Sequence, residues 1–103
     1  MKYIRTKDGK IFEYNPLLNV AVYENVVKEA DTIEELCDRC VVIHKYGEQP
    51  KDMSFYEAEY FIDVWTRKVK SNDPITAIYG AIWTDKGLIY VAKMNDKGEW
   101  ELL

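Results

Sequence analysis

The chain of 103 residues is 48% hydrophobic and 31% charged, which predicts a single globular domain over residues 1–103 and excludes a disordered chain. Its net charge of −4 disfavours nucleic acid and anionic lipid as partners, and its two cysteines are too few for a disulfide scaffold. The longest apolar run, Ala77 to Trp83, is far shorter than the ~20 residues of a membrane-spanning helix, and the charged N-terminus argues against a secretory signal. We therefore expect a cytoplasmic protein with no membrane partner.

The N-terminal residues predict a β-hairpin. β-prone residues 3–6 and 10–14 flank Asp8-Gly9, a pair that suits the positive φ of a two-residue hairpin loop. Asn15-Pro16 ends this run, and residues 20–23 together with Val26-Val27 predict one or two further short strands.

Two capping boxes predict helix starts. Thr32 with Glu35 begins a short helix, and Ser54 with Glu57 begins a longer one that we expect to run to about Lys70. The longer helix carries one apolar stripe suited to packing across a sheet, formed by Ala58, Phe61, Ile62, Trp65 and Val69.

The remaining residues predict strands. Residues 40–44 read as a buried strand and residues 46–52 as a polar loop, while 75–84, 88–94 and 99–102 form a meander with turns ending in Gly87 and Gly98. The middle strand of the meander is apolar on both faces, so we expect it to be central and covered on both sides by a helix or a second subunit. The predicted fold is α+β, a mostly antiparallel sheet with one long amphipathic helix packed on it and one short helix.

Cys37-Asp-Arg-Cys40, followed by His44, is the most suggestive motif for chemistry. Thiolates and an imidazole can seed a zinc site, but the chain has no third cysteine and no second histidine to complete a tetrahedral set. Redox-active pairs use a helix N-terminus to lower the thiol pKa, whereas this pair follows a helix. We therefore predict two buried thiols at a helix-to-strand junction and a strand-end histidine, with no catalytic residue, metal or cofactor.

The spacing of the glycines and the basic residues of the hairpin bear on whether the protein binds a nucleotide or a nucleic acid. The five glycines cannot form either phosphate-binding glycine motif. The hairpin carries a basic strip with interleaved aromatic rings that could bind a nucleic acid, although a solvated hairpin is the plainer interpretation. The strip contains Lys2, Arg5, Lys7 and Lys10 with Tyr3, Phe12 and Tyr14.

The candidate partner-binding residues are acids and tyrosines. Only Lys28 opposes the acidic residues of segment 24–38, which are Glu24, Glu29, Asp31, Glu34, Glu35 and Asp38. The plain interpretation is helix-start carboxylates and a solvated face, and the functional one is an acidic patch for a basic partner, centred on Glu34 and Glu35. Tyr56 and Tyr60, four residues apart and off the main helical stripe, could anchor the same partner.

Three segments resemble a set of small uncharacterised proteins of phages and prophages in Gram-positive bacteria: residues 1–11, residues 30–38 (ADTIEELCD), and residues 78–103, which begin IYGAIWTDKGLIYVAKMNDKG. The resemblance covers about half the chain. It implies an accessory protein of a mobile element, acting in the host cytoplasm, and carries over no catalytic residue. Our first hypothesis is thus a non-enzymatic binder or inhibitor of a host macromolecule, most simply a protein. The alternatives are a small-ligand or nucleotide-signal binder built on a homodimer, and an enzyme using Cys37, Cys40 and His44.

Overall fold

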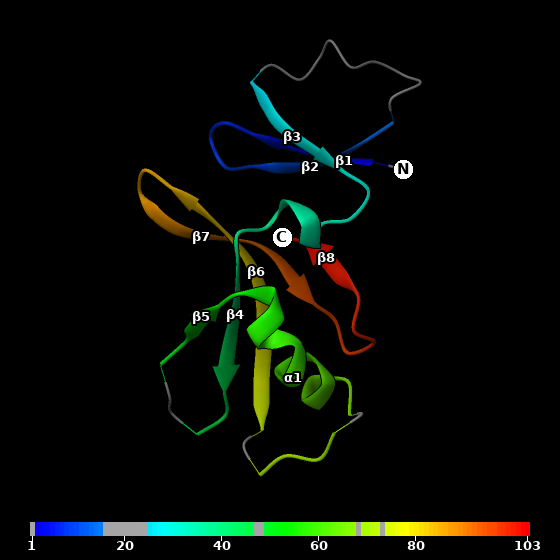
Figure 1. The fold of residues 1–103 in the computed structure, drawn as a ribbon, viewed down its shortest axis with the longest axis vertical. Coiled ribbons are helices and arrows are strands. Elements are labelled where there is room, and N and C mark those ends of the chain that lie inside the picture. The colour runs from blue at the N-terminus through cyan, green and yellow to red at the C-terminus, as the bar shows by residue number, and fades with distance from the viewer. Residues whose placement is uncertain (1, 16–24, 47–48, 68, 73) are drawn as a thin grey trace.

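A computed structural model of the protein describes residues 2–15, 25–46, 49–67, 69–72 and 74–103. These described residues form three strands, a short 3₁₀ helix, two strands, one α-helix and three final strands (Figure 1). In order they are β1 (Lys2–Thr6), β2 (Ile11–Tyr14), β3 (Val26–Ala30), η1 (Glu34–Leu36), β4 (Arg39–His44), β5 (Lys51–Met53), α1 (Phe55–Trp65), β6 (Ile75–Thr84), β7 (Gly87–Met94) and β8 (Trp100–Leu102). The predicted α+β class with mostly antiparallel pairing is therefore confirmed.

The described strands form two antiparallel sheets instead of the single predicted sheet. Sheet A has three strands in the order β2-β1-β3, and sheet B has five strands in the order β5-β4-β6-β7-β8. Figure 1 shows sheet A at the top of the view, above sheet B, with η1 on the connection from β3 to β4. The short η1 segment therefore links the two sheets.

The predicted N-terminal hairpin is present, but its loop is longer than predicted. Arg5 pairs with Ile11, and the Thr6 N–H donates to the Lys10 carbonyl at 2.9 Å. Gly9 adopts the left-handed conformation, with φ +86, but Asp8 does not. The predicted two-residue loop gives a positive φ to this pair of residues. A Cβ on Gly9 would lie 2.7 Å from Thr84 Cγ2, so the turn sits close against the end of β6. The predicted strand over residues 20–23 lies outside the described residues.

Helix α1 starts as predicted and ends earlier. The Ser54 hydroxyl accepts from the Glu57 N–H at 3.1 Å while the Glu57 carboxylate accepts from the Ser54 N–H at 3.2 Å, which completes the capping box. The helix is 11 residues long and not the long helix predicted to residue 70. It stops where Arg67 turns to the left-handed φ of 65; just before it, the Thr66 hydroxyl bonds to the Ile62 carbonyl at 3.0 Å.

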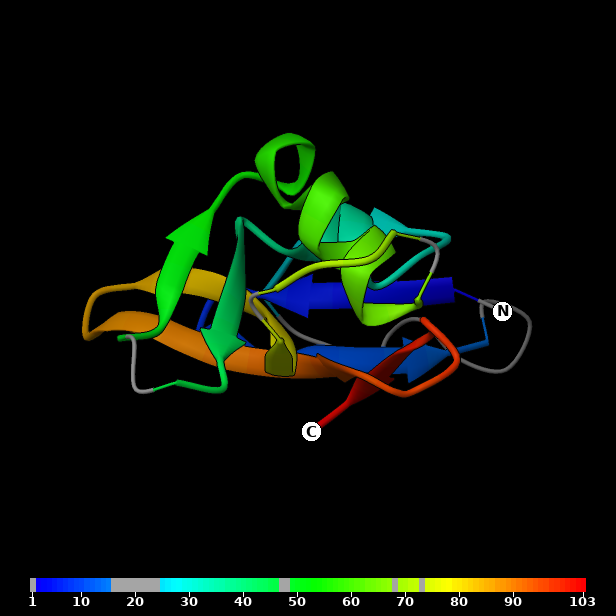
Figure 2. The ribbon, with the colours of Figure 1, turned by 90° about the horizontal axis from the view of Figure 1, so that it is seen from below.

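The main core lies between α1 and sheet B. Figure 2 shows α1 on one side of that sheet. Ala58 is the buried contact point of the helix, with Phe61, Ile62 and Trp65 packed beside it as the apolar stripe predicted; Val69 lies beyond the helix. The sheet contributes Cys40, Val42, Met53, Ile78 and Met94. Met53 belongs to the edge strand β5, which replaces the last part of the loop predicted over residues 46–52.

On the other face of sheet B, two tyrosine rings of its own strands lie over part of the sheet. The prediction that residues 88–94 form the central, doubly covered strand is wrong, because β6 is central and Tyr90 on β7 remains 38% exposed. The rings of Tyr79 and Tyr90 stack 4.8 Å apart. They stand opposite Val41 and Ala81, which are only 2% and 0% exposed, so this ring pair shields the small residues beneath it.

Candidate functional site

The cysteine and histidine motif does not assemble into a reactive centre in the described residues. Cys40 and His44 lie on the same strand, β4, about 13 Å apart along it, which is too far for one metal ion. Both side chains face the core, where the His44 ring meets Phe61 edge-on at 5.5 Å. Across the described ranges no group of three or more His, Cys, Asp or Glu side chains is placed to hold a metal.

Both cysteines are free thiols; Cys40 is buried as the sequence predicts, whereas Cys37 is only partly buried. Burial, and to a lesser degree the neighbouring Asp38 charge, raises the pKa of Cys37 to about 12. Burial, followed by the Glu34 charge, raises the pKa of Cys40 to about 12 as well. A thiol in this state carries a proton at neutral pH and is a poor nucleophile.

The basic strip of the hairpin is largely neutralised by carboxylates. Lys2 lies 3.3 Å from Glu29, and Arg5 lies 2.7 Å from Asp38. Lys10 lies 3.9 Å from Asp8, the residue before Gly9. Three of the four cations of the strip therefore have a carboxylate partner in the structure.

The same contacts use much of the acidic segment internally. Glu29, Asp31 and Asp38 all pair with cations of β1, while Glu24 lies outside the described residues. The Thr32 hydroxyl accepts from the Glu35 N–H at 3.3 Å, which is one of the two hydrogen bonds of the predicted capping box, but the helix that follows is the three-residue η1 and its N-cap is Ile33. Glu34 and Glu35 therefore stand on one short turn between the sheets.

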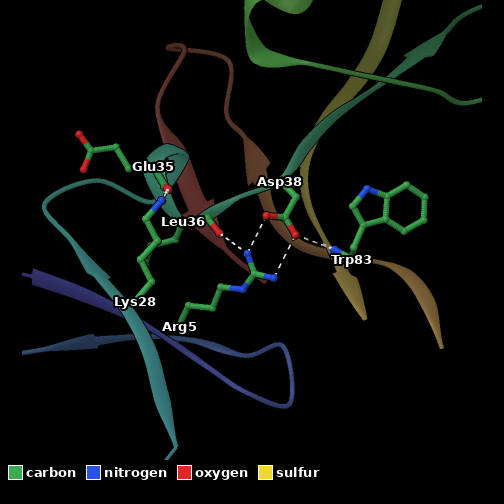
Figure 3. Close-up of polar contacts among 6 residues, drawn as sticks. All are labelled: Arg5, Lys28, Glu35, Leu36, Asp38 and Trp83. Atoms are coloured by element: carbon green, nitrogen blue, oxygen red, sulfur yellow. Dashed lines mark hydrogen bonds and ion pairs between the residues drawn. The ribbon is translucent and has the colours of Figure 1, made fainter. Parts of the chain in front are cut away.

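Side chains of sheet A donate hydrogen bonds to the backbone carbonyls of η1, as Figure 3 shows. Lys28 Nζ donates to the Glu35 carbonyl at 2.7 Å, and Arg5 Nη1 donates to the Leu36 carbonyl at 3.2 Å. Leu36 itself is buried. The Glu35 side chain remains exposed and points away from these contacts (Figure 3).

Glu34 lines a shallow hollow between η1 and the start of α1. The hollow has a volume of about 340 Å³ and is lined by Glu34, Phe55, Tyr56, Glu59 and Ile62, a set that we call the acidic hollow. Within the described part of the chain, neither of its carboxylates forms an ion pair. Two acidic side chains from different elements thus flank aromatic and aliphatic surface.

The structure brings together two of the four predicted partner-binding residues. Glu34 and Tyr56 both line the acidic hollow, and Tyr56 is 86% exposed. Glu35 and Tyr60 do not line it; the Tyr60 ring instead packs edge-on against Phe61 at 5.4 Å.

Sequence reasoning missed three residues of the hollow. Phe55, Glu59 and Ile62 follow the spacing i, i+4 and i+7, which places them on one helical face. That signal is present in the sequence, but Ile62 also belongs to the stripe predicted to pack on the sheet. Nothing in the sequence says that this face meets Glu34, because that juxtaposition depends on how η1 is held.

A second hollow of about 930 Å³ lies beyond the end of α1. Its lining includes Trp65, Arg67, Lys70, Asn72 and Asp96. Arg67 and Lys70 both follow the C-terminal end of α1, and neither lies in its last turn.

Comparison with known proteins finds no matching family, curated protein or solved structure. Among the described residues, no helix is both long and apolar enough to cross a membrane.

Proposed function

We propose that the protein is a non-enzymatic accessory protein of a phage or prophage that binds a host protein in the host cytoplasm. The acidic hollow is the proposed binding site. The observation that carries this proposal is that Glu34, from the connection between the sheets, and Glu59, from α1, flank the same surface formed by Phe55, Tyr56 and Ile62. Mobile-element origin rests on the resemblance of residues 1–11, 30–38 and 78–103.

The chemistry of the hollow favours a basic segment as its occupant. A lysine or arginine side chain can lay its aliphatic stem on Phe55 and Ile62 while its charged end meets the carboxylates of the rim. Tyr56 can add a ring face to such a cation, and exposed tyrosines are enriched among residues that dominate protein interfaces. A neutral or acidic partner would leave the two carboxylates without a countercharge.

The state of the thiols supports a binding role over catalysis. The cysteine pair of the motif that the sequence offers for catalysis, Cys37 and Cys40 with His44, has thiol pKa values raised to about 12. Cysteine nucleophiles require the opposite shift, because the thiolate is the reactive form.

The proposal is tested by capture from a host-type bacterial lysate with matched variants. The tagged wild type is compared with Glu34→Lys/Glu59→Lys and with Glu13→Lys/Asp85→Lys, which changes the net charge equally but lies outside the hollow. A partner retained by wild type and control, lost from the hollow variant and competed by a lysine-rich and arginine-rich peptide, supports the proposal. A partner retained equally by all three contradicts it.

The larger hollow favours a second candidate function, a small-ligand binder. Its volume of about 930 Å³ falls within the usual range for ligand sites, and Arg67 and Lys70 would suit an anionic ligand. If this ligand binder is a homodimer, light scattering of the purified protein gives twice the monomer mass. Denaturing the protein releases the bound small anion, which mass spectrometry detects. A monomer with no released molecule contradicts it.

A further inference from the structure

We infer that Arg5 and Lys28, both in sheet A, are positioning residues that set the location of Glu34 in the wall of the acidic hollow. This inference rests on the proposed function of that hollow. It assigns sheet A a role in recognition although none of its residues lines the hollow.

The 3₁₀ helix η1 is too short to hold its own position. A three-residue 3₁₀ helix contains few internal hydrogen bonds, and their geometry is poor. Within η1 the Cys37 N–H donates to the Glu34 carbonyl at 3.1 Å. The carbonyls of Glu35 and Leu36 instead accept from side chains of sheet A.

Both side chains that donate to η1 from sheet A are cations, and they bond to its last two carbonyls. Lys28 reaches the Glu35 carbonyl at 2.7 Å, and Arg5 reaches the Leu36 carbonyl at 3.2 Å. Charged donors make stronger hydrogen bonds than neutral donors. The residue next to Glu35 is Glu34, so fixing these carbonyls fixes the backbone from which the Glu34 side chain projects.

Arg5 is itself held in place by Asp38, the residue before β4 of sheet B. The Asp38 carboxylate accepts from Arg5 Nη1 at 2.7 Å and from Nη2 at 3.0 Å, and it also accepts from the Trp83 N–H at 2.9 Å (Figure 3). The Asp38 N–H donates to the Ala81 carbonyl at 2.9 Å. Through Asp38, the guanidinium of β1 is tied to β6 of sheet B.

Cys37 provides a direct reporter of this arrangement. A Cβ on Gly80 would lie only 2.8 Å from Cys37 Sγ, so the thiol is seated against β6 directly after η1. If η1 moves, the thiol leaves this site and becomes accessible to a labelling reagent. The reporter does not require any knowledge of the partner.

The experiment compares Arg5→Gln and Lys28→Gln with Arg39→Gln. Arg39 also pairs with a carboxylate, but its ion pair, at 3.1 Å, is to Asp52 of β5 and not to the carbonyls of η1, so it controls for loss of a cation. Lys28 is exposed, so its variant retains the fold even if Arg5→Gln does not. We expect both sheet A variants to label Cys37 about tenfold faster and to bind the partner about tenfold more weakly, as loss of one charged hydrogen bond requires.

Each outcome addresses a different claim. Equal Cys37 labelling in wild type, Arg5→Gln and Lys28→Gln overturns the inference, because η1 then keeps its place without the cations. Faster labelling with unchanged partner binding contradicts the proposed binding site, and the positioning role falls with it. Weaker binding with unchanged Cys37 labelling also overturns the inference, because the cations then act on the partner in another way.

Discussion

Arg5 and Asp38 join the two sheets through a two-bond ion pair, with Nη1 2.7 Å from Oδ1 and Nη2 3.0 Å from Oδ2. The residues lie 33 positions apart in the sequence, and each side chain makes a further hydrogen bond. Arg5 also holds the end of η1, while Asp38 accepts from the Trp83 N–H. This single pair therefore connects the packing of the sheets to the location of Glu34.

Acid should weaken this connection. Bonding to Arg5, helped by the Trp83 N–H, lowers the pKa of Asp38 in the folded protein. A carboxyl with a lowered folded-state pKa stabilises the fold above its unfolded pKa of about 3.9, and this contribution is lost as pH falls through the folded value. We expect Asp38→Asn to reduce the loss of stability below about pH 4, measured by urea unfolding at several pH values. Parallel pH profiles for wild type and variant would contradict this expectation.

High pH should destabilise the protein through its thiols. The folded-state pKa values of Cys37 and Cys40 are raised to about 12, so the thiol contribution to stability is complete below the ordinary cysteine pKa of about 8.5. That contribution decreases as pH rises from there through the folded value. Denaturant unfolding between about pH 7 and pH 11 should show a smaller decline for Cys37→Ala than for wild type. An identical decline would show that the thiol is not protected by burial.

Gly80 and Cys37 should be energetically coupled. Alanine at position 80 would place its Cβ 2.8 Å from Cys37 Sγ, and overpacking of this kind costs about 1–3 kcal/mol. Removing the sulfur with Cys37→Ala should relieve part of that cost. In a double-mutant cycle of unfolding free energies, the double variant should be more stable than the two single effects predict. Strict additivity would show that the contact does not limit the packing.

The N-cap of α1 should contribute measurably to stability. Ser54→Ala removes the acceptor for the Glu57 N–H and should lower the free energy of unfolding by about 1 kcal/mol. Ser54→Asp keeps an acceptor at the same position and should remain close to wild type. Equal destabilisation by both substitutions would mean that the cap contributes nothing beyond packing.

Local chemistry explains which parts of the fold are readable from the sequence. The capping box at Ser54, the Asp8-Gly9 turn and the strands of the C-terminal meander all depend on residues close together in the chain. The early end of α1 was not readable, because Arg67 takes a left-handed conformation that non-glycine residues rarely adopt.

Long-range contacts explain what the sequence does not give. The division into two sheets follows from the order of strand pairing, and the acidic hollow depends on Glu34 meeting a helix that begins 21 residues later, at Phe55. Composition identified Glu34 and Tyr56 as candidates but treated Glu35 and Tyr60 as their equals. The structure separates the two pairs, because the hollow is lined by Glu34 and Tyr56 but not by Glu35 or Tyr60.

That separation gives a specific prediction for recognition. Glu35→Lys and Tyr60→Ala should leave partner affinity within about twofold of wild type, because neither residue lines the hollow. Tyr56→Ala should weaken binding about tenfold, since truncating an exposed tyrosine anchor commonly costs more than 1 kcal/mol. Calorimetric titration of the captured partner distinguishes these variants. A larger effect at Glu35 or Tyr60 than at Tyr56 would place the binding surface elsewhere.

The measurement that tests the central claim most directly is the affinity of the captured partner for Glu34→Lys, compared with Glu13→Lys. Both substitutions reverse one exposed charge, but only the first lies in the acidic hollow. We predict that Glu34→Lys weakens binding at least about tenfold while Glu13→Lys leaves it near wild type, with both variants unfolding at the same denaturant concentration as wild type. Equal affinities for the two variants would contradict the acidic hollow as the binding site.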